Sequence, residues 1–255
     1  MKLITLNIWG GKIYEPLIEF FEHHAKDTDI FCLQDLLFGS EPSFTAVSGG
    51  RINIFNELKK ILSDFNYSIF RTPGESHFHD ELLDSNIGCG QAIFVRKSFP
   101  ILESGGFRTP EAEFFRGGDL ANGKHHWVKF RSNGEDFTVM NVHGMWQRDS
   151  KKSDTPKRMT QSQNIKNFFD SVTGKKILCG DLNLAPNTEA MRILEENMVN
   201  LVKKYKIDST RSSHYTKEGK FADYILVSED VEVSNFKVLP DEVSDHLALM
   251  AEFIK

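Results

Sequence analysis

The chain alternates between short apolar runs typical of buried strands and longer segments with helical spacing. Residues 2–8 form a β-rich apolar run closed by a turn at 9–11, and residues 29–34 form a second run that ends at Asp35. The further strands that the pattern predicts span 67–70, 90–96, 125–132, 135–143, 175–183, 221–228 and 246–253. Strands are therefore expected from the first residues to the last.

Apolar residues at helical spacing predict amphipathic helices between these strands. They are Leu17, Phe20, Phe21 and Ala25, then Ile54, Phe55, Leu58, Ile61, Leu62 and Phe65, then Met159, Ile165, Phe168 and Phe169. Thr155-Pro156 is a typical helix start, and a further helix is expected within 187–197. Because a hairpin turn signal also occurs at 133–134, we expect an α/β fold with mixed sheets and a single domain, 1–255.

Composition and charge exclude several classes of protein. The 40% hydrophobic and 26% charged fractions exclude a mainly disordered chain. The net charge of -5 excludes a global positive field for nucleic acid, so any polyanion must be bound locally. No apolar run approaches the ~18 residues that span a bilayer, and the first residues do not resemble a signal peptide. We expect a cytoplasmic monomer without a membrane span.

The three cysteines, Cys32, Cys89 and Cys179, are odd in number, far apart in the chain and set inside apolar runs. Buried reduced thiols are the simplest interpretation of that pattern. The cysteines therefore indicate a reducing compartment.

The segment 175–186 (KKILCGDLNLAP) places two polar residues at the end of a predicted strand. Asp181 and Asn183 are two apart, so in an extended segment they face the same side. The Asp can hold or deprotonate a water, and the Asn can donate hydrogen bonds to an oxygen that gains negative charge. A turn rich in Asp and Asn after a strand explains this segment equally well.

The triplet Ser244-Asp245-His246 precedes the last predicted strand and places an anion beside an imidazole. Taken alone it is weak, because a histidine at a strand start is more often a surface or core residue. Similar polar residues at or near strand ends are Asn7, Asp35, His143 and Asp223. Residues scattered over a surface would not prefer strand ends, so the set indicates one shared pocket.

Six short motifs, in the order TLNIWGG, LQD, NVHG, GDLN, ADYILVS and SDH, extend from residue 5 to residue 246. Their series resembles that of the endonuclease/exonuclease/phosphatase superfamily, which includes pancreatic deoxyribonuclease, neutral sphingomyelinases and inositol polyphosphate 5-phosphatases. The resemblance implies a four-layer α/β/β/α sandwich of two packed mixed β-sheets with outer helices. It also implies a hydrolase of phosphate esters, with a phosphodiesterase or nuclease as the best single guess and nucleic acid among the candidate substrates.

The resemblance also implies catalytic roles for five residues. Asp181 would orient or deprotonate the attacking water, and Asn183 would contact the phosphate. His143 would bind the phosphate or assist the leaving group. Asp223 would fix the imidazole of His246, which would stabilise the pentavalent phosphorus.

A divalent metal ion is implied as well, with Asp35 as its main ligand and Asn7 and Asp245 beside it. Carboxylate and amide oxygens suit Mg²⁺, with Mn²⁺ as the second choice. The family usually has LQE where this chain has Leu33-Gln34-Asp35, and Asp is shorter by one C–C bond, roughly 1.5 Å. Our hypothesis is retained activity with an altered metal preference.

The shorter ligand leaves a second class of function open. A catalytically weakened module could keep the pocket to bind phosphate or a partner, and Asp35 is the residue that favours it. The presence of Asp181, Asn183 and His246 argues against that alternative.

Substrate-binding candidates outside the motifs are Arg116 in the Gly-rich insert 107–126, Arg158 on the helix after NVHG, and Trp146. Solvated surface positions explain them equally well. The stretch 118–125 nearly matches a phosphate loop, but histidine replaces the Ser or Thr that binds Mg²⁺ and a strand follows, which excludes a nucleoside triphosphatase. The histidine pairs 23–24 and 125–126, and the pair His77 and His79, are expected to be surface residues and not zinc ligands.

Overall fold

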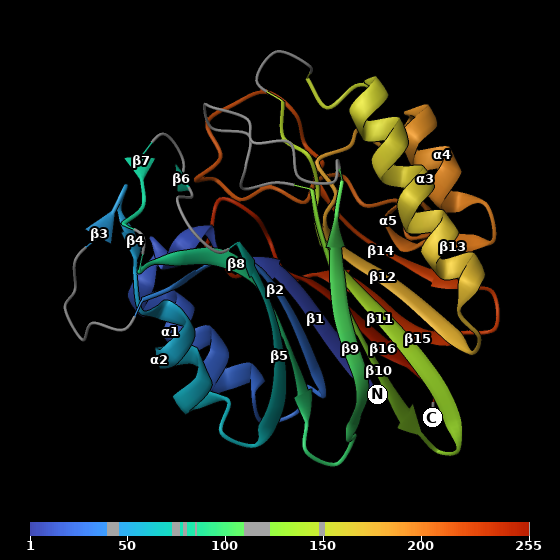
Figure 1. Ribbon diagram of the computed structural model, residues 1–255, viewed down its shortest axis with the longest axis horizontal. Helices are drawn as coiled ribbons and strands as arrows, with labels where there is room; N and C mark the ends of the chain where they lie inside the picture. Colours follow the sequence, from blue (N-terminus) through green and yellow to red (C-terminus); the bar gives the residue numbers. More distant parts are fainter. Residues whose placement is uncertain are drawn as a thin grey trace.

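The protein is described by a computed structural model in which residues 1–39, 46–72, 77–78, 81–84, 86–109, 123–147 and 151–254 are placed. Two six-stranded mixed sheets pack face to face, and helices cover both outer faces (Figure 1). The predicted four-layer α/β/β/α sandwich is confirmed. Within the described ranges, no helix is both long and apolar enough to cross a membrane.

The first sheet has the strand order β15-β16-β1-β2-β8-β5. Its strands are β1 (Lys2–Asn7), β2 (Ile30–Phe38), β5 (Phe65–Thr72), β8 (Gly88–Arg96), β15 (Val233–Val238) and β16 (Leu249–Phe253). Strands β1 and β2 run parallel, and the other neighbours are antiparallel. Short two-stranded pairs, β3 (Ala46–Val47) with β4 (Gly50–Arg51) and β6 (His77–Phe78) with β7 (Glu81–Leu82), lie outside this sheet.

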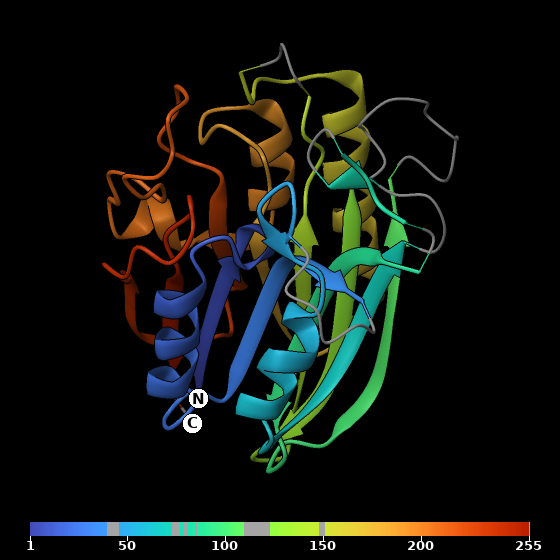
Figure 2. The same ribbon diagram turned by 90° about the vertical axis from the view of Figure 1, so that its left-hand side faces the viewer.

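The second sheet has the strand order β13-β14-β12-β11-β10-β9. Its strands are β9 (Ile101–Arg108), β10 (Lys124–Ser132), β11 (Glu135–His143), β12 (Lys175–Asp181), β13 (Met198–Asn200) and β14 (Asp223–Ser228). Strands β11 and β12 are parallel. The two termini meet at one end of the molecule, where the amino group of Met1 donates to the carbonyl of Phe253 at 2.8 Å (Figure 2).

The helices are η1 (Trp9–Gly11), α1 (Tyr14–His24), α2 (Ile54–Ile61), α3 (Pro156–Ser171), α4 (Glu189–Glu195) and α5 (Leu201–Lys204). The four helices that the sequence pattern predicts are present as α1 to α4, whereas η1, expected as a turn, and α5 were not predicted as helices. Helix α3 starts as expected, because Thr155 Oγ1 accepts a hydrogen bond from the amide of Arg158 at 3.2 Å. Phe65, predicted as the last position of the second helix, instead begins β5, where its ring lies 5.6 Å from that of Phe31.

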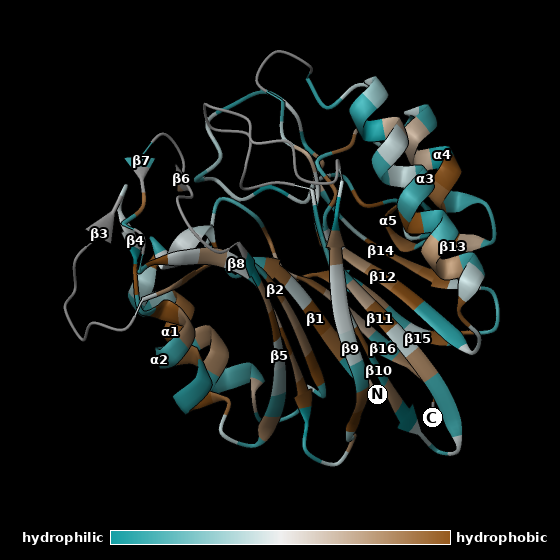
Figure 3. Cartoon of the chain, in the orientation of Figure 1, coloured by the Kyte–Doolittle hydropathy of each residue, from teal (hydrophilic) through white to brown (hydrophobic). Residues whose placement is uncertain are grey.

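Hydrophobic residues, coloured brown on the ribbon in Figure 3, form two buried clusters. One lies between the sheets and beneath α3 and α4, and the other lies between the first sheet and helices α1 and α2. Cys32, Cys89 and Cys179 are free and buried in these clusters, as the sequence predicts.

Some strands differ from the prediction for identifiable reasons. Strand β2 does not end at Asp35 but continues to Phe38. A β-bulge between Leu33 and Leu36 accommodates Gln34 and Asp35, so the pairing with β8 resumes after them. Strands β9 and β15 have no predicted counterpart, since both are sheet edges with several exposed positions and therefore lack a long apolar run. His246 precedes β16, which begins only at Leu249.

His125 and His126 are buried on β10, so the expectation that they are surface residues is wrong. The ring of His125 stacks on Phe107 at 4.5 Å, and His126 Nε2 lies 2.9 Å from Ser68 Oγ. Burial lowers the pKa of His125 to about 4 and that of His126 to about 3. Both imidazoles are therefore neutral parts of the packing near pH 7.

Asn141 joins the two sheets at the β2 bulge. It lies on β11, and its amide group donates to the carbonyls of Leu33 at 2.9 Å and Ala92 at 3.3 Å. Its Oδ1 accepts from Gln34 Nε2 at 2.6 Å, and its backbone carbonyl accepts from Gln91 Nε2 at 3.1 Å. One buried side chain of the second sheet thus holds both strands that flank the bulge in the first.

Replacement of Asn141 tests this role. We expect Asn141→Leu to lower the free energy of unfolding by about 2–4 kcal/mol, because buried carbonyls lose their hydrogen-bond donor. Urea denaturation measures the change, with Asn167→Leu on the exposed face of α3 as the matched control, expected within about 0.5 kcal/mol of the wild type. Equal stability of the two variants would contradict the role of Asn141.

Candidate active site

Ionisable residues form one row across five neighbouring strands of the second sheet. The strand register pairs Arg108 with Lys124, Lys124 with His143, His143 with Asp181, and Asp181 with Asp223. Residues directly opposite each other in neighbouring strands point to the same face of a sheet. The row therefore changes from basic at β9 to acidic at β14, along the edge where the polar strand ends were predicted to meet.

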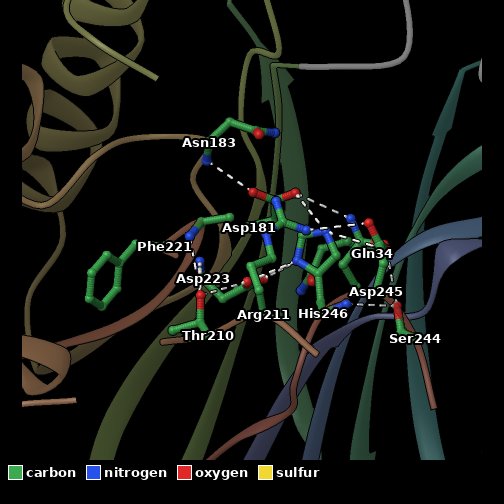
Figure 4. A network of polar contacts seen from close by, with 12 residues as sticks. Gln34, Asp181, Asn183, Thr210, Arg211, Phe221, Asp223, Ser244, Asp245 and His246 are labelled. Atoms are coloured by element: carbon green, nitrogen blue, oxygen red, sulfur yellow. Dashed lines mark hydrogen bonds and ion pairs between the residues drawn. The ribbon is translucent and has the colours of Figure 1, made fainter. Parts of the chain in front are cut away.

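Asp181 lies at the centre of the contacts in this row (Figure 4). Its side chain is 3% exposed, and its Oδ2 accepts a hydrogen bond from Asn7 Nδ2, on the other sheet, at 3.2 Å. The same oxygen lies 3.7 Å from His246 Nε2 and 3.9 Å from His143 Nε2, while Oδ1 accepts from the amide of Asn183 at 3.0 Å. Four predicted site residues thus converge on one carboxylate.

Asp223 fixes the imidazole of His246. Its two carboxylate oxygens lie 2.9 and 2.8 Å from His246 Nδ1, and its Oδ2 also accepts from Thr210 Oγ1 at 3.2 Å. Because a carboxylate holds a proton on Nδ1, the Nε2 atom faces Asp181 and the pocket. The predicted Asp–His pair is therefore present.

Charge and burial set the protonation of the central groups. Burial by itself would raise the pKa of Asp181, but His246, His143, Arg211 and Lys152 together lower it below its usual value, so the carboxylate is ionised at neutral pH. Burial lowers the pKa of His143 against the opposing effect of Asp35 and Asp181. His143 is therefore mainly neutral at pH 7, and its Nδ1 has no hydrogen-bond partner among the described residues.

The GDLN segment needs an unusual backbone. Gly180 has φ +122, and a Cβ there would lie 2.2 Å from the carbonyl oxygen of Val142, so no other residue fits this crossing. Asn183 has φ 52 and donates from Nδ2 to the carbonyl of Gly144 at 3.2 Å. The bond from the Asn183 amide to Asp181 Oδ1 makes this an Asx turn, so the prediction of an extended segment at Asp181 and Asn183 is wrong.

Two further carboxylates lie near one ammonium group. Burial lowers the pKa of Lys12, and Asp35 and Asp245 both oppose this shift, which places both close to it. Asp35 is buried at φ 62 in the bulge, and its carboxylate accepts a weak hydrogen bond from Cys89 Sγ at 3.8 Å. Buried carboxylate oxygens with such weak partners are the donor set that a hard divalent cation prefers, so these residues fit the implied metal.

Asp181, Asp223 and His246 also offer ligand atoms that all lie within 4.8 Å of one another. An ion bound by these three would have to compete with the short bonds between His246 Nδ1 and Asp223. Asp35 and Asp245 therefore fit the implied ion better than the Asp–His pair does.

The predicted substrate-binding residues are not part of the row. Arg158 is buried on α3 and donates to the carbonyls of Met145 at 3.3 Å and Ser153 at 2.7 Å, so it supports the loop after β11. Trp146 is half-buried on that loop, with the ammonium of Lys217 5.6 Å from its ring. Arg116 lies outside the described residues. A substrate contact by any of the three stays a prediction.

Thr210 and Arg211 are site residues that the strand-end pattern does not predict. They lie in the irregular segment between α5 and β14, where no periodic pattern exists, yet Thr210 orients Asp223 and Arg211 forms a β-bridge to His246. The available signal in the sequence was that Thr210 and Arg211 are adjacent polar residues in the segment before the strand with the ADYILVS motif.

Solved structures share this architecture. A protein of the endonuclease/exonuclease/phosphatase family from Leptotrichia buccalis has a TM-score of 0.69 and 18% identity, with 100% of each chain covered. The mannosyl-6-phosphatase of Bacteroides thetaiotaomicron has a TM-score of 0.65 and 18% identity, again with 100% of each chain covered. The human Nocturnin catalytic domain with a bound sulfate anion has a TM-score of 0.69 and 20% identity, over 100% of this chain and 93% of that one. At these identities the likeness shows the fold alone.

Sequence comparison assigns the family. No curated protein sequence matches the chain. The sequence profile described as the Endonuclease/Exonuclease/phosphatase family matches residues 4–246, a range that contains Asn7 at one end and His246 at the other. This match over almost the whole chain, together with the sandwich fold, shows that the chain belongs to the endonuclease/exonuclease/phosphatase family.

Proposed function

We propose that the protein is a metal-dependent phosphoester hydrolase that attacks phosphorus directly with water. The observation that carries the proposal is the buried, ionised Asp181 held between Asn7, His143 and His246. The similar structures include a mannosyl-6-phosphatase and a catalytic domain with a bound sulfate, a tetrahedral anion like phosphate. Both are compatible with this site.

Asp181 would accept the proton of the attacking water. Its pKa is lowered, so it is ionised at neutral pH, and the Asn183 amide and Asn7 Nδ2 fix both of its oxygens. A carboxylate held in this way cannot rotate away from the water that it orients. The proposed role is therefore positioning together with proton acceptance.

The two histidines would stabilise the negative charge that develops on the phosphate oxygens, by donating hydrogen bonds to them. Asp223 holds His246 through Nδ1 and aims Nε2 at the pocket, and it would stabilise an imidazolium there. His143, neutral and buried, would donate one hydrogen bond without the cost of burying a charge.

Asp35 would hold the divalent ion, with Asp245 and Asn7 beside it. When bound, the ion would neutralise charge on the phosphate. Mg²⁺ suits these oxygen donors, and Mn²⁺ would tolerate the shorter Asp35 better because Mg²⁺ demands near-ideal geometry at about 2.0–2.1 Å. A nuclease or other phosphodiesterase was the best guess from sequence, but membership of the family does not select the substrate.

Hydrolysis of generic nitrophenyl phosphates with Mg²⁺ or Mn²⁺ tests the proposed function. We expect turnover by the wild type and a loss of about 10³-fold or more in kcat for Asp181→Asn and for His246→Ala, because each removes a group that acts only in the transition state. The exposed controls Asp208→Asn and His214→Ala should retain wild-type rates. If no phosphate ester is hydrolysed by the wild type, the phosphate-binding module, which Asp35 favours, is the better account.

Replacement of Asp35 tests the metal assignment. We expect Asp35→Glu to shift the ratio of Mn²⁺- to Mg²⁺-supported activity toward Mg²⁺ by about tenfold or more, because the longer side chain restores the reach of the usual glutamate. Titration of initial rates with each metal measures the ratio. An identical metal profile in the variant and the wild type would show that Asp35 does not set the metal preference.

A further inference from the structure

Two cations lie beside the catalytic contacts, on segments that the family motifs do not include. We call Arg211 and Lys152 the loop cation pair. Arg211 follows Thr210 in the segment before β14, and Lys152 lies in the segment before α3. Burial and the charge of Arg211 together lower the pKa of Lys152 to about 8, against the opposing effect of Asp181, Asp223 and Asp245.

The guanidinium of Arg211 is buried with most of its donors unused. Its side chain is 7% exposed, and its guanidinium forms an ion pair with Asp245, with Nη1 3.5 Å from Oδ2. Its Nε has no hydrogen-bond partner in the described part of the chain, although a guanidinium carries five N–H donors. A buried donor without an acceptor is costly, so an acceptor that enters with the substrate would be bound strongly.

Lys152 has a similar surplus of donors. Its ammonium donates to the carbonyl of Phe221 at 2.8 Å and lies 5.5 Å from the ring of Tyr215. The same ring lies 4.1 Å from the guanidinium of Arg211, so Tyr215 contacts both cations through its ring. The positive charges of Arg211 and Lys152 repel each other, and an anion bound between them would reduce that repulsion.

The position of Arg211 relates the pair to the reaction. Arg211 pairs with His246 in a β-bridge, and its charge acts on Asp181 (Figure 4). Both cations of the loop pair therefore act on the proposed water-orienting group Asp181, and they lie on segments outside β2, which carries Asp35. The pair is part of the site, not a separate surface patch.

A terminal phosphate and an internal diester differ in the number of oxygens that they present. A phosphomonoester has three nonbridging oxygens and two negative charges when fully ionised, whereas a diester has two such oxygens and one charge. The metal side and the histidines can serve two oxygens. A third oxygen would find unused donors at the buried guanidinium of Arg211, which lies 4.1 Å from the ring of Tyr215.

We infer that Arg211 and Lys152 bind the nonbridging oxygens of a terminal phosphate, so that the enzyme prefers phosphomonoesters to phosphodiesters. The inference rests on the proposed function, because it assigns the substrate class of the same site. In the step, the water oxygen forms the new P–O bond and its proton passes to Asp181. The bond to the alcohol oxygen breaks with its electron pair, and the alkoxide takes a proton from solvent, which yields inorganic phosphate and an alcohol.

The test compares two substrates with the same leaving group, p-nitrophenyl phosphate and methyl p-nitrophenyl phosphate, on the full chain with Mn²⁺. We expect the wild type to have the higher kcat/KM for the monoester. Arg211→Gln should lower kcat/KM for the monoester by about 10- to 100-fold, and by less than about threefold for the diester, because the charge-assisted bonds serve only the additional oxygen. Lys152→Met should show the same bias with a smaller loss.

Controls separate this role from a structural one. Lys151→Met, the neighbour of Lys152 with a side chain 85% exposed, should leave both rates at wild-type values. Arg211→Lys should recover part of the monoester activity, and thermal unfolding verifies that each variant is folded. If Arg211→Gln is unfolded, Lys152→Met carries the comparison alone.

Three results would decide against the inference in different ways. Equal losses on both substrates, or a wild type that prefers the diester, would overturn the monoester assignment and leave the proposed function standing. A wild type that hydrolyses neither substrate would overturn the proposed function itself, and the inference with it.

Discussion

The position of the Asp181 carboxylate between the two sheets is the constraint on which the rest of the site depends. Asp181 ends β12 in one sheet, yet it accepts a hydrogen bond from Asn7 at the end of β1 in the other. That bond forms only if both sheets end at the same height. The contacts of Asn141 with Leu33 and Gln34 hold the sheets in this alignment deeper in the core. Packing and chemistry therefore share one geometric requirement.

The electrostatics of the pocket follow from the order of the strands. Basic residues Arg108 and Lys124 occupy one end of the row, and Asp181 and Asp223 occupy the other, because neighbouring strands bring them into register. Buried carboxylates are stable only with cations near them. His246 Nδ1 is within hydrogen-bond distance of Asp223, and Arg211 forms an ion pair with Asp245, so both carboxylates have a partner before a substrate enters.

Much of the site could be predicted from sequence because its residues end strands. Asn7, His143 and Asp181 each close an apolar run that the pattern shows plainly, and parallel neighbours bring such ends together. The bulge that gives Asp35 its positive φ could not be predicted, since it depends on how β2 pairs with β8. Arg211 was missed for a related reason: its place beside His246 comes from a β-bridge between two irregular segments.

The burial of His126 shows the same limit. Its neighbours in the chain resemble a hairpin strand with one exposed face, but Ser68, a residue of β5 in the other sheet, lies 2.9 Å from its ring. Only the packing of one sheet on the other decides which polar residues become core. Local pattern predicted the elements, whereas contacts between the sheets decided the roles of these residues.

The position of the metal ion tests the central claim most directly. The claim is that the ion binds at Asp35, beside the pair formed by Asp223 and His246 and not on it. Crystals soaked in Mn²⁺ and measured at its absorption edge would give an anomalous peak at each bound ion. We predict a peak within bonding distance of the Asp35 carboxylate, with His246 still bound to Asp223. A peak bound by Asp181, Asp223 and His246, with none at Asp35, would contradict the account.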